Sequence, residues 1–209
     1  MAGEGQTGPR NPVVRRLWCR HKRTRRAAAH MKIMIFLHGT TIMHRSALGR
    51  TRAERVSQVV NGDGSIADFA SYVPVENSAL KLQTWKRQGA EIVYLSSHTN
   101  AEDVRSDDLV LRTHGFPEGR VVYRQAGGQY ADLAASVRPD VLIEDDCESI
   151  GGETQMVYPH IPPDLRKRVS SIVVKEFGGI DHLPDDIDRL LGRRGQSAAR
   201  RPQSSRHRR

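Results

Sequence analysis

The chain has 209 residues and a formal net charge of +9, a length that allows one ordinary domain with extensions. Such a charge suggests a nucleic-acid or anionic-membrane partner, but its distribution argues against this for the body of the chain. Residues 1–30 hold eight basic residues and one acidic residue, and residues 192–209 hold seven arginines and no acid. Residues 31–191 are therefore mildly acidic, with 23 acidic against 18 basic residues.

Composition also excludes several classes of protein. No run of 18 or more apolar residues occurs, so we expect no membrane span. The first residues lack the apolar segment of a secretory signal. The only two cysteines, Cys19 and Cys147, provide neither a disulfide framework nor a zinc cluster of thiolates. We therefore expect a cytoplasmic protein.

The two ends differ in composition from the body. Residues 1–30 are rich in Gly, Pro and Arg and are predicted to be a disordered basic extension. Because an apolar run begins directly at Met31, we also consider that the native chain starts there. Residues 192–209 are predicted to be a disordered Arg-rich tail. Such tails bind polyanions weakly and without specificity, and Trp18 is their only aromatic residue, so no stacking platform is expected.

Between the ends, strand and helix signals alternate. Short apolar runs predict five buried strands, at Ile33–Leu37, Glu91–Leu95, Arg120–Arg124, Asp140–Ile143 and Ser171–Val174. Helices are expected at Glu76–Gln88, from Asn100 to Thr113, at Gln129–Val137 and at Asp185–Leu191. In the first of these helices, Leu80, Leu82 and Trp85 are expected on one face, with Asn77 as the cap.

This alternation predicts an α/β fold, a three-layer, doubly wound and mainly parallel five-stranded sheet spanning residues 31–191. In such sheets, ligands bind beyond the carboxyl ends of the strands. The loops that follow the strands therefore carry the candidate functional residues.

The fourth strand runs into Glu144, Asp145 and Asp146, with Glu148 close behind. Crowded carboxylates repel one another, so an ordered cluster favours a bound cation. An oxygen-rich set with few histidines suits Mg²⁺, and we predict that Glu144, Asp145 and Asp146 bind it. The alternative is a solvated acidic turn at a helix N-terminus.

Hydroxyl groups follow the first two strands. Ser96 and Ser97 end the second strand, where hydroxyls can bind a phosphate, although they can equally cap the following helix. After the first strand come His38, Gly39 and Thr40, and the glycine allows the backbone to approach a ligand closely. His38 is the candidate catalytic group, although a lone histidine is more often structural.

Taken together, residues 32–191 resemble the haloacid dehalogenase-like hydrolases. In that family, a first strand precedes an Asp-x-Asp-Gly-Thr loop, a second strand ends in Ser or Thr, and a fourth strand ends in paired acids for Mg²⁺. Here Ser96 matches the second motif and Val141 to Asp146 match the fourth. The third motif supplies Lys or Arg, which leaves Arg124 as a candidate phosphate ligand.

The first motif departs from the family pattern. Aligning Gly39 and Thr40 places Phe36 where the nucleophilic Asp belongs and His38 where the acid/base Asp belongs, and no register supplies a carboxylate. The family reaction needs that Asp to attack phosphorus and to bind Mg²⁺.

Residues 38–74, here called the flap, form a modest insertion before the second motif.

Three functions follow as hypotheses. The first is an atypical Mg²⁺-dependent phosphohydrolase acting on a small phosphorylated molecule. The second is a non-catalytic relative that binds such a ligand or regulates another protein. The third is nucleic-acid binding through the basic ends.

Overall fold

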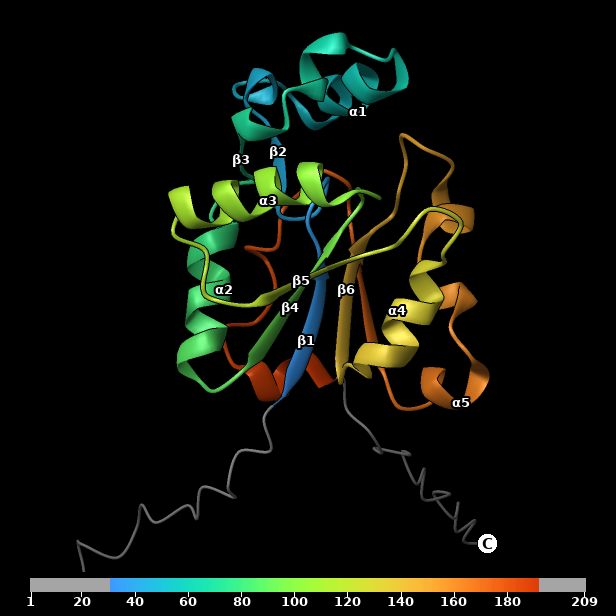
Figure 1. Cartoon of the computed structure of the whole chain (residues 1–209). Helices are drawn as coiled ribbons and strands as arrows, with labels where there is room; N and C mark the ends of the chain where they lie inside the picture. The colour runs from blue at the N-terminus through green and yellow to red at the C-terminus, as the bar shows by residue number, and fades with distance from the viewer. Residues whose placement is uncertain (1–30, 192–209) are drawn as a thin grey trace, which may run out of the picture.

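The computed structural model describes residues 31–191, so the expectations for the two ends lie outside the described residues. Its centre is an all-parallel five-stranded sheet in the order β5-β4-β1-β6-β7 (Figure 1). The strands are β1 (Lys32–Phe36), β4 (Glu91–Ser96), β5 (Arg120–Tyr123), β6 (Val141–Asp145) and β7 (Ser170–Val174). The predicted three-layer α/β fold and its five strands are confirmed.

Both faces of the sheet are buried, which explains why the strands read as continuous apolar runs. Along β1, Ile33 and Ile35 pack in one hydrophobic cluster, and Met34 packs in a second cluster on the opposite face. All three side chains are fully buried. The alternation also extends along β6, where Ile143 and Leu142 belong to opposite clusters.

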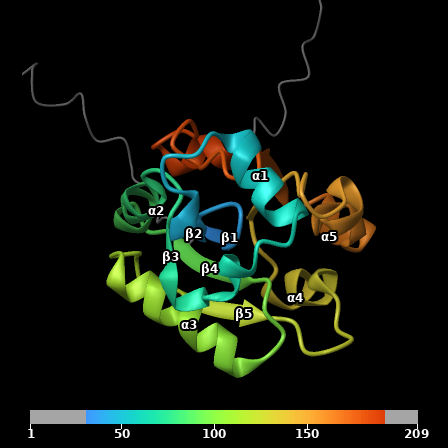
Figure 2. The same cartoon turned by 90° about the horizontal axis from the view of Figure 1, so that it is seen from above.

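Helices cover the two faces separately (Figures 1 and 2). One cluster contains side chains from α2 (Ser78–Arg87), α3 (Ala101–Thr113) and the 3-10 helix η7 (Ile187–Leu191). The other contains side chains from α4 (Tyr130–Val137), together with residues in or beside η6 (Tyr158–His160) and α5 (Pro163–Arg166). The 3-10 helix η5 (Gly152–Gln155) follows β6. The short helix expected at Asp185–Leu191 is a 3-10 helix over Ile187–Leu191, and α5 was not expected.

Three expectations for α2 are wrong in detail. The helix starts at Ser78 rather than Glu76, which has a positive φ of 49°. Asn77 makes no capping bond and instead donates its side-chain amide to Asp181 at 2.7 Å. Leu80 is exposed, whereas Leu82 and Trp85 are buried. In α3, by contrast, Asn100 caps the helix by accepting hydrogen bonds from the N–H groups of Glu102 and Asp103.

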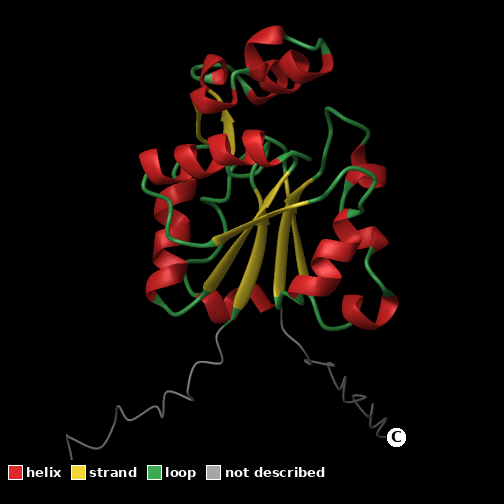
Figure 3. Ribbon diagram, in the orientation of Figure 1, coloured by secondary structure: helices red, strands yellow, loops and turns green. Residues whose placement is uncertain are grey.

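The flap stands beyond the carboxyl ends of the strands (Figures 1 and 3). It contains an antiparallel pair, β2 (Ile42–His44) and β3 (Tyr72–Pro74), and the helix α1 (Arg52–Val60). The 3-10 turns η2 (Arg45–Ala47), η3 (Gly64–Ala67) and η4 (Phe69–Ser71) complete it. Three flap side chains form a small core with Val75 and Phe177, namely Met43, Ala47 and Val56. The flap therefore packs on the loop that follows β7.

Among residues 31–191, no helix has the length and apolar character that crossing a membrane requires.

Candidate functional site

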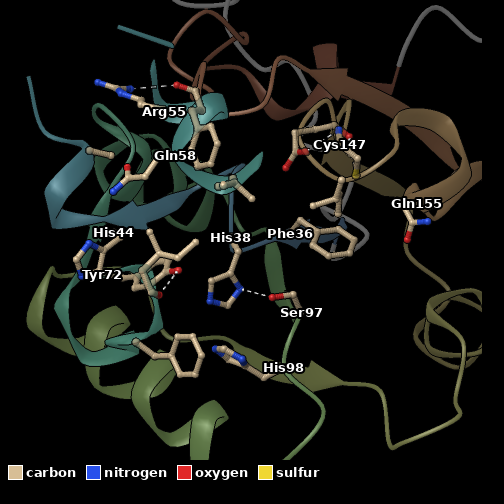
Figure 4. A pocket seen from close by; sticks show the side chains of 18 of the residues that line it. Phe36, His38, His44, Arg55, Gln58, Tyr72, Ser97, His98, Cys147 and Gln155 are labelled. Atoms are coloured by element: carbon tan, nitrogen blue, oxygen red, sulfur yellow. Dashed lines mark hydrogen bonds between the residues drawn. The ribbon is translucent and has the colours of Figure 1, made fainter. Parts of the chain in front are cut away.

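A cavity of about 290 Å³ lies between the carboxyl edge of the sheet and the flap. The sheet contributes Phe36 and the loops after β1, β4, β5 and β6, and the flap contributes Phe69 and Tyr72. Figure 4 shows His38 between Tyr72 and Ser97. The cavity is lined largely by apolar and aromatic side chains with a few polar groups, which is typical of a small-molecule site.

His38 has a polar neighbour at each ring nitrogen. Nδ1 lies 2.9 Å from the hydroxyl of Ser97 (Figure 4), and Nε2 lies 3.1 Å from Oδ1 of Asp107. The Nε2 and Oδ1 atoms are close but not aligned for a hydrogen bond, and neither has a hydrogen-bond partner among residues 31–191. The ring also packs edge-on against Tyr72 and His98, with centroids 5.2 and 4.6 Å away.

Asp107 connects the loop after β4 to α3. Its side chain is only 1% exposed, although it occupies a core-facing position of the helix between Val104 and Leu111. Its Oδ2 accepts a 2.6 Å hydrogen bond from Ser96. Its Oδ1 lies 3.6 Å from Nε2 of His98. Burial, with His38 nearby, lowers the pKa of His98, while Asp107 and Asp103 act in the opposite direction.

Asp145 has a protein donor on each oxygen. Thr40 donates a 2.6 Å hydrogen bond to Oδ2, and the backbone N–H of Cys147 donates to Oδ1 at 2.9 Å. Burial raises the pKa of Asp145, and the two donors only partly oppose this rise. Burial and the neighbouring carboxylates also raise the pKa of the Cys147 thiol. Cys147 is therefore a poor nucleophile, because its thiolate is disfavoured.

The other two predicted carboxylates point elsewhere. Glu144 precedes Asp145 in β6, so its side chain lies on the opposite face of the sheet, where it accepts the backbone N–H groups of Val157 and Tyr158. Asp146 accepts from Lys175 at 2.9 Å. Partial burial would raise the pKa of Asp146, but Lys175 and the N–H of Glu176 lower it. The structure thus offers no shared Mg²⁺ site formed by all three carboxylates.

The structure brings five of the predicted site residues to the cavity. These are His38, Gly39, Ser97, Arg124 and Asp145. The remaining four do not line the cavity, and each is hydrogen-bonded to a protein group, namely Thr40, Ser96, Glu144 and Asp146. Their assigned roles in phosphate or Mg²⁺ binding stay predictions.

Phe36 lies where the family resemblance would require a nucleophilic carboxylate. Phe36 ends β1 and packs edge-on against Tyr130, with ring centroids 5.1 Å apart. It therefore serves as an apolar wall of the cavity. The guanidinium of Arg124 lies 4.7 Å from the centroid of the same Tyr130 ring, a distance at which a cation is attracted to the ring face.

Sequence reasoning did not single out Asp107 or the side chain of His98, and it missed Arg55, which reaches the cavity from α1. One signal was available. A carboxylate at a core-facing helical position, three residues after Val104 and four before Leu111, is unusual without a partner. The sequence of the flap gave no sign that Arg55 would reach the cavity at the carboxyl edge of the sheet.

No family model matches the chain, and a search of curated proteins gives no match. Two solved structures of Pnkp1/Rnl/Hen1 assemblies, one described as an RNA repair complex, are similar to 71% of this chain at 13% and 14% identity, with TM-scores of 0.44 and 0.45. The chain spans less than half of those proteins, 48% and 44%. A universal stress protein in complex with cAMP matches 69% of this chain and 94% of its own length at 14% identity, with a TM-score of 0.26. These similarities are too low to carry an argument about function.

Proposed function

We propose that the protein binds a small organic ligand, with a flat apolar body and an anionic group, in the cavity beneath the flap. The observation that carries this proposal is the pairing of aromatic walls with two partly buried arginines in one cavity at the carboxyl edge of a parallel sheet. This edge is where doubly wound sheets bind ligands. The proposal corresponds to the non-catalytic alternative considered from the sequence.

The aromatic walls favour the flat apolar body. Phe36, Tyr130 and Phe177 approach the cavity from the sheet side, and Phe69 and Tyr72 approach it from the flap. Aromatic rings prefer offset or edge-on contacts with other rings. A ligand with a ring can therefore stack here without a change in the fold.

Two arginines favour the anionic group. Arg55 and Arg124 both line the cavity, and the Nε atom of each is buried without a hydrogen-bond partner. Nη1 of Arg55 already donates to the carbonyl of Phe177 and pairs with Glu76, so Arg124 is the principal anion-binding group. Buried polar atoms are normally paired, and guanidinium groups bind carboxylates and phosphates in a fixed geometry. A phosphate or carboxylate of the ligand supplies the missing acceptors.

Binding is favoured over phosphate-ester hydrolysis because the groups that hydrolysis needs are absent or engaged. Phe36 cannot attack phosphorus, and both oxygens of Asp145 accept hydrogen bonds from protein groups. Hydrolysis of a phosphate ester is therefore the competing function, and the experiment must distinguish it from binding.

The test uses 4-nitrophenyl phosphate, which combines a flat ring with a phosphate. Isothermal titration should show saturable binding by the full chain, with no release of nitrophenolate in the presence of Mg²⁺. Arg124→Gln should weaken binding by about 10-fold, since loss of one charged hydrogen bond costs on the order of 1.5 kcal/mol. Arg87→Gln is the matched control, because Arg87 lies at the end of α2 and bonds only Thr84.

Mg²⁺-dependent release of nitrophenolate that Asp145→Asn abolishes would overturn the proposal in favour of hydrolysis. Equal affinity of wild type and Arg124→Gln for the compound would contradict the assignment of Arg124 as a ligand of the anionic group.

A further inference from the structure

Three buried atoms without a hydrogen-bond partner face one another beside the cavity. They are Nε2 of His38, Nε2 of His98 and Oδ1 of Asp107. The candidate ligand atoms of these residues all lie within 4.8 Å of one another. An unpaired buried polar group costs about 1–3 kcal/mol, so three at one point call for a common partner.

The two distances from Asp107 to the histidines are close to those between ligands around one small cation. Oδ1 of Asp107 lies 3.1 Å from Nε2 of His38 and 3.6 Å from Nε2 of His98. Ligand atoms about 2.0–2.1 Å from a tetrahedral ion are separated from one another by about 3.3 Å. The observed separations fall on either side of that value.

The outer atoms of His38 and Asp107 are hydrogen-bonded to serines, whereas His98 has a carboxylate nearby but beyond hydrogen-bond distance. Ser97 contacts Nδ1 of His38 at 2.9 Å, and Ser96 donates to Oδ2 of Asp107 at 2.6 Å. On the third side chain, Nδ1 of His98 lies 3.9 Å from a carboxylate oxygen of Asp103. Partners of this kind orient metal ligands and fix the histidine tautomer. When Ser97 accepts a hydrogen from Nδ1 of His38, the lone pair on Nε2 faces the carboxylate oxygen, and a cation between them removes the repulsion.

We propose that His38, His98 and Asp107 form a binding site for one divalent transition-metal ion, with Zn²⁺ as its probe. Two imidazoles and one carboxylate suit Zn²⁺ and its first-row neighbours, whereas Mg²⁺ prefers oxygen ligands alone. Three protein ligands leave a coordination position for water or a ligand. His38 and His98 both line the cavity, so the ion borders it. The site is independent of the Mg²⁺ prediction for Glu144, Asp145 and Asp146, and of the proposed cavity ligand.

The alternative is a metal-free cluster in which Asp107 pairs with a protonated histidine. The Nε2 atom of His38 is not aligned to donate to Oδ1, which favours the metal. The two possibilities differ in whether Zn²⁺ binds to these three side chains.

The experiment is a titration of the full chain with Zn²⁺ alone, after removal of metals with a chelator. Wild type should bind one equivalent that His98→Gln and Asp107→Asn both lose. Ser97→Ala removes an outer partner and should weaken the affinity for that equivalent by about 10- to 100-fold. Excess Mg²⁺ should not displace the ion.

His44→Gln is the matched control. His44 is a buried histidine whose Nε2 also lacks a hydrogen-bond partner, but among residues 31–191 no carboxylate lies within ion-pair distance of it. This variant should keep the equivalent of Zn²⁺. Thermal unfolding of every variant checks that the fold survives. X-ray absorption of the zinc-loaded wild type gives a second measurement that needs no variant, with two imidazoles expected among the ligands.

Loss of Zn²⁺ binding in the two ligand variants, but not in His44→Gln, supports the site. Equal Zn²⁺ binding by wild type, His98→Gln and Asp107→Asn would overturn it and leave the metal-free ion pair. An absorption spectrum without imidazole ligands would contradict the proposal in the same way.

Discussion

Thr40 Oγ1 donates a 2.6 Å hydrogen bond to Oδ2 of Asp145, joining the loop after β1 to the end of β6. Both side chains are buried, with Thr40 fully inaccessible to solvent. The N–H of Cys147 donates to the other oxygen, Oδ1, so both oxygens of Asp145 accept a hydrogen bond. Asp145, which the sequence presents as a metal ligand, is therefore a link between two parts of the carboxyl edge.

Replacing Thr40 by valine should destabilise the protein, because the shape is kept while a buried acceptor loses its donor. We expect the free energy of unfolding to fall by about 1–3 kcal/mol, measured by urea denaturation. Thr113→Val is the control, since Thr113 is exposed at the end of α3 and should change stability by no more than about 0.5 kcal/mol. Equal effects of the two substitutions would show that the Thr40 hydrogen bond contributes nothing.

Asp145→Asn should change how stability depends on pH. Burial raises the pKa of Asp145 in the folded state, so the folded protein retains this proton to a higher pH than the unfolded chain. The stabilisation from the protonated carboxyl is complete at low pH and is lost as pH rises through the folded pKa. Asparagine cannot ionise and does not suffer this loss.

The stability of Asp145→Asn relative to wild type should therefore increase as pH rises above 3.8, the ordinary pKa of an aspartate, and level off once Asp145 is ionised in the folded protein. Urea denaturation at each pH, in the presence of EDTA, measures this difference. A difference that stays constant or falls with pH would mean that burial does not raise the pKa of Asp145.

Gly39→Ala should be more destabilising than Gly49→Ala. Both glycines have positive φ, 81° and 74°, so each substitution carries a similar backbone strain of about 1–2 kcal/mol. A Cβ at Gly39 would lie 3.0 Å from Oδ2 of Asp145 and 3.2 Å from Cγ of Glu176, whereas a Cβ at Gly49 meets nothing within 4 Å. Thermal unfolding of both variants isolates the effect of crowding. Equal losses would show that the loop moves aside freely.

The sheet could be predicted from the sequence because each strand is buried on both faces and therefore reads as an apolar run. It was harder to predict on which side of a helix or strand an individual side chain lies. Leu80 was grouped with Leu82, although residues two positions apart do not share a helix face, and it is exposed in the structure. The alternation of side chains along a strand would by itself have placed Glu144 and Asp145 on opposite faces of the sheet.

The candidate site was only partly predictable. Loops after parallel strands meet at one edge, which is why His38, Ser97 and Asp145 were found from their positions in the sequence. Asp107 and Arg55 reach the same region from α3 and from the flap helix α1. Their placement depends on how those helices pack, and local sequence patterns do not determine that packing.

The measurement that tests the central claim most directly is a titration of the isotope-labelled protein with 4-nitrophenyl phosphate, followed in ¹H–¹⁵N spectra. If the cavity beneath the flap is the binding site, saturable shifts should concentrate at the backbone amides of Phe36, Ser97, Arg124 and Tyr130, which all line it. Saturable shifts confined to Asp146 and Lys175, or no shifts at millimolar concentrations of the compound, would contradict the account.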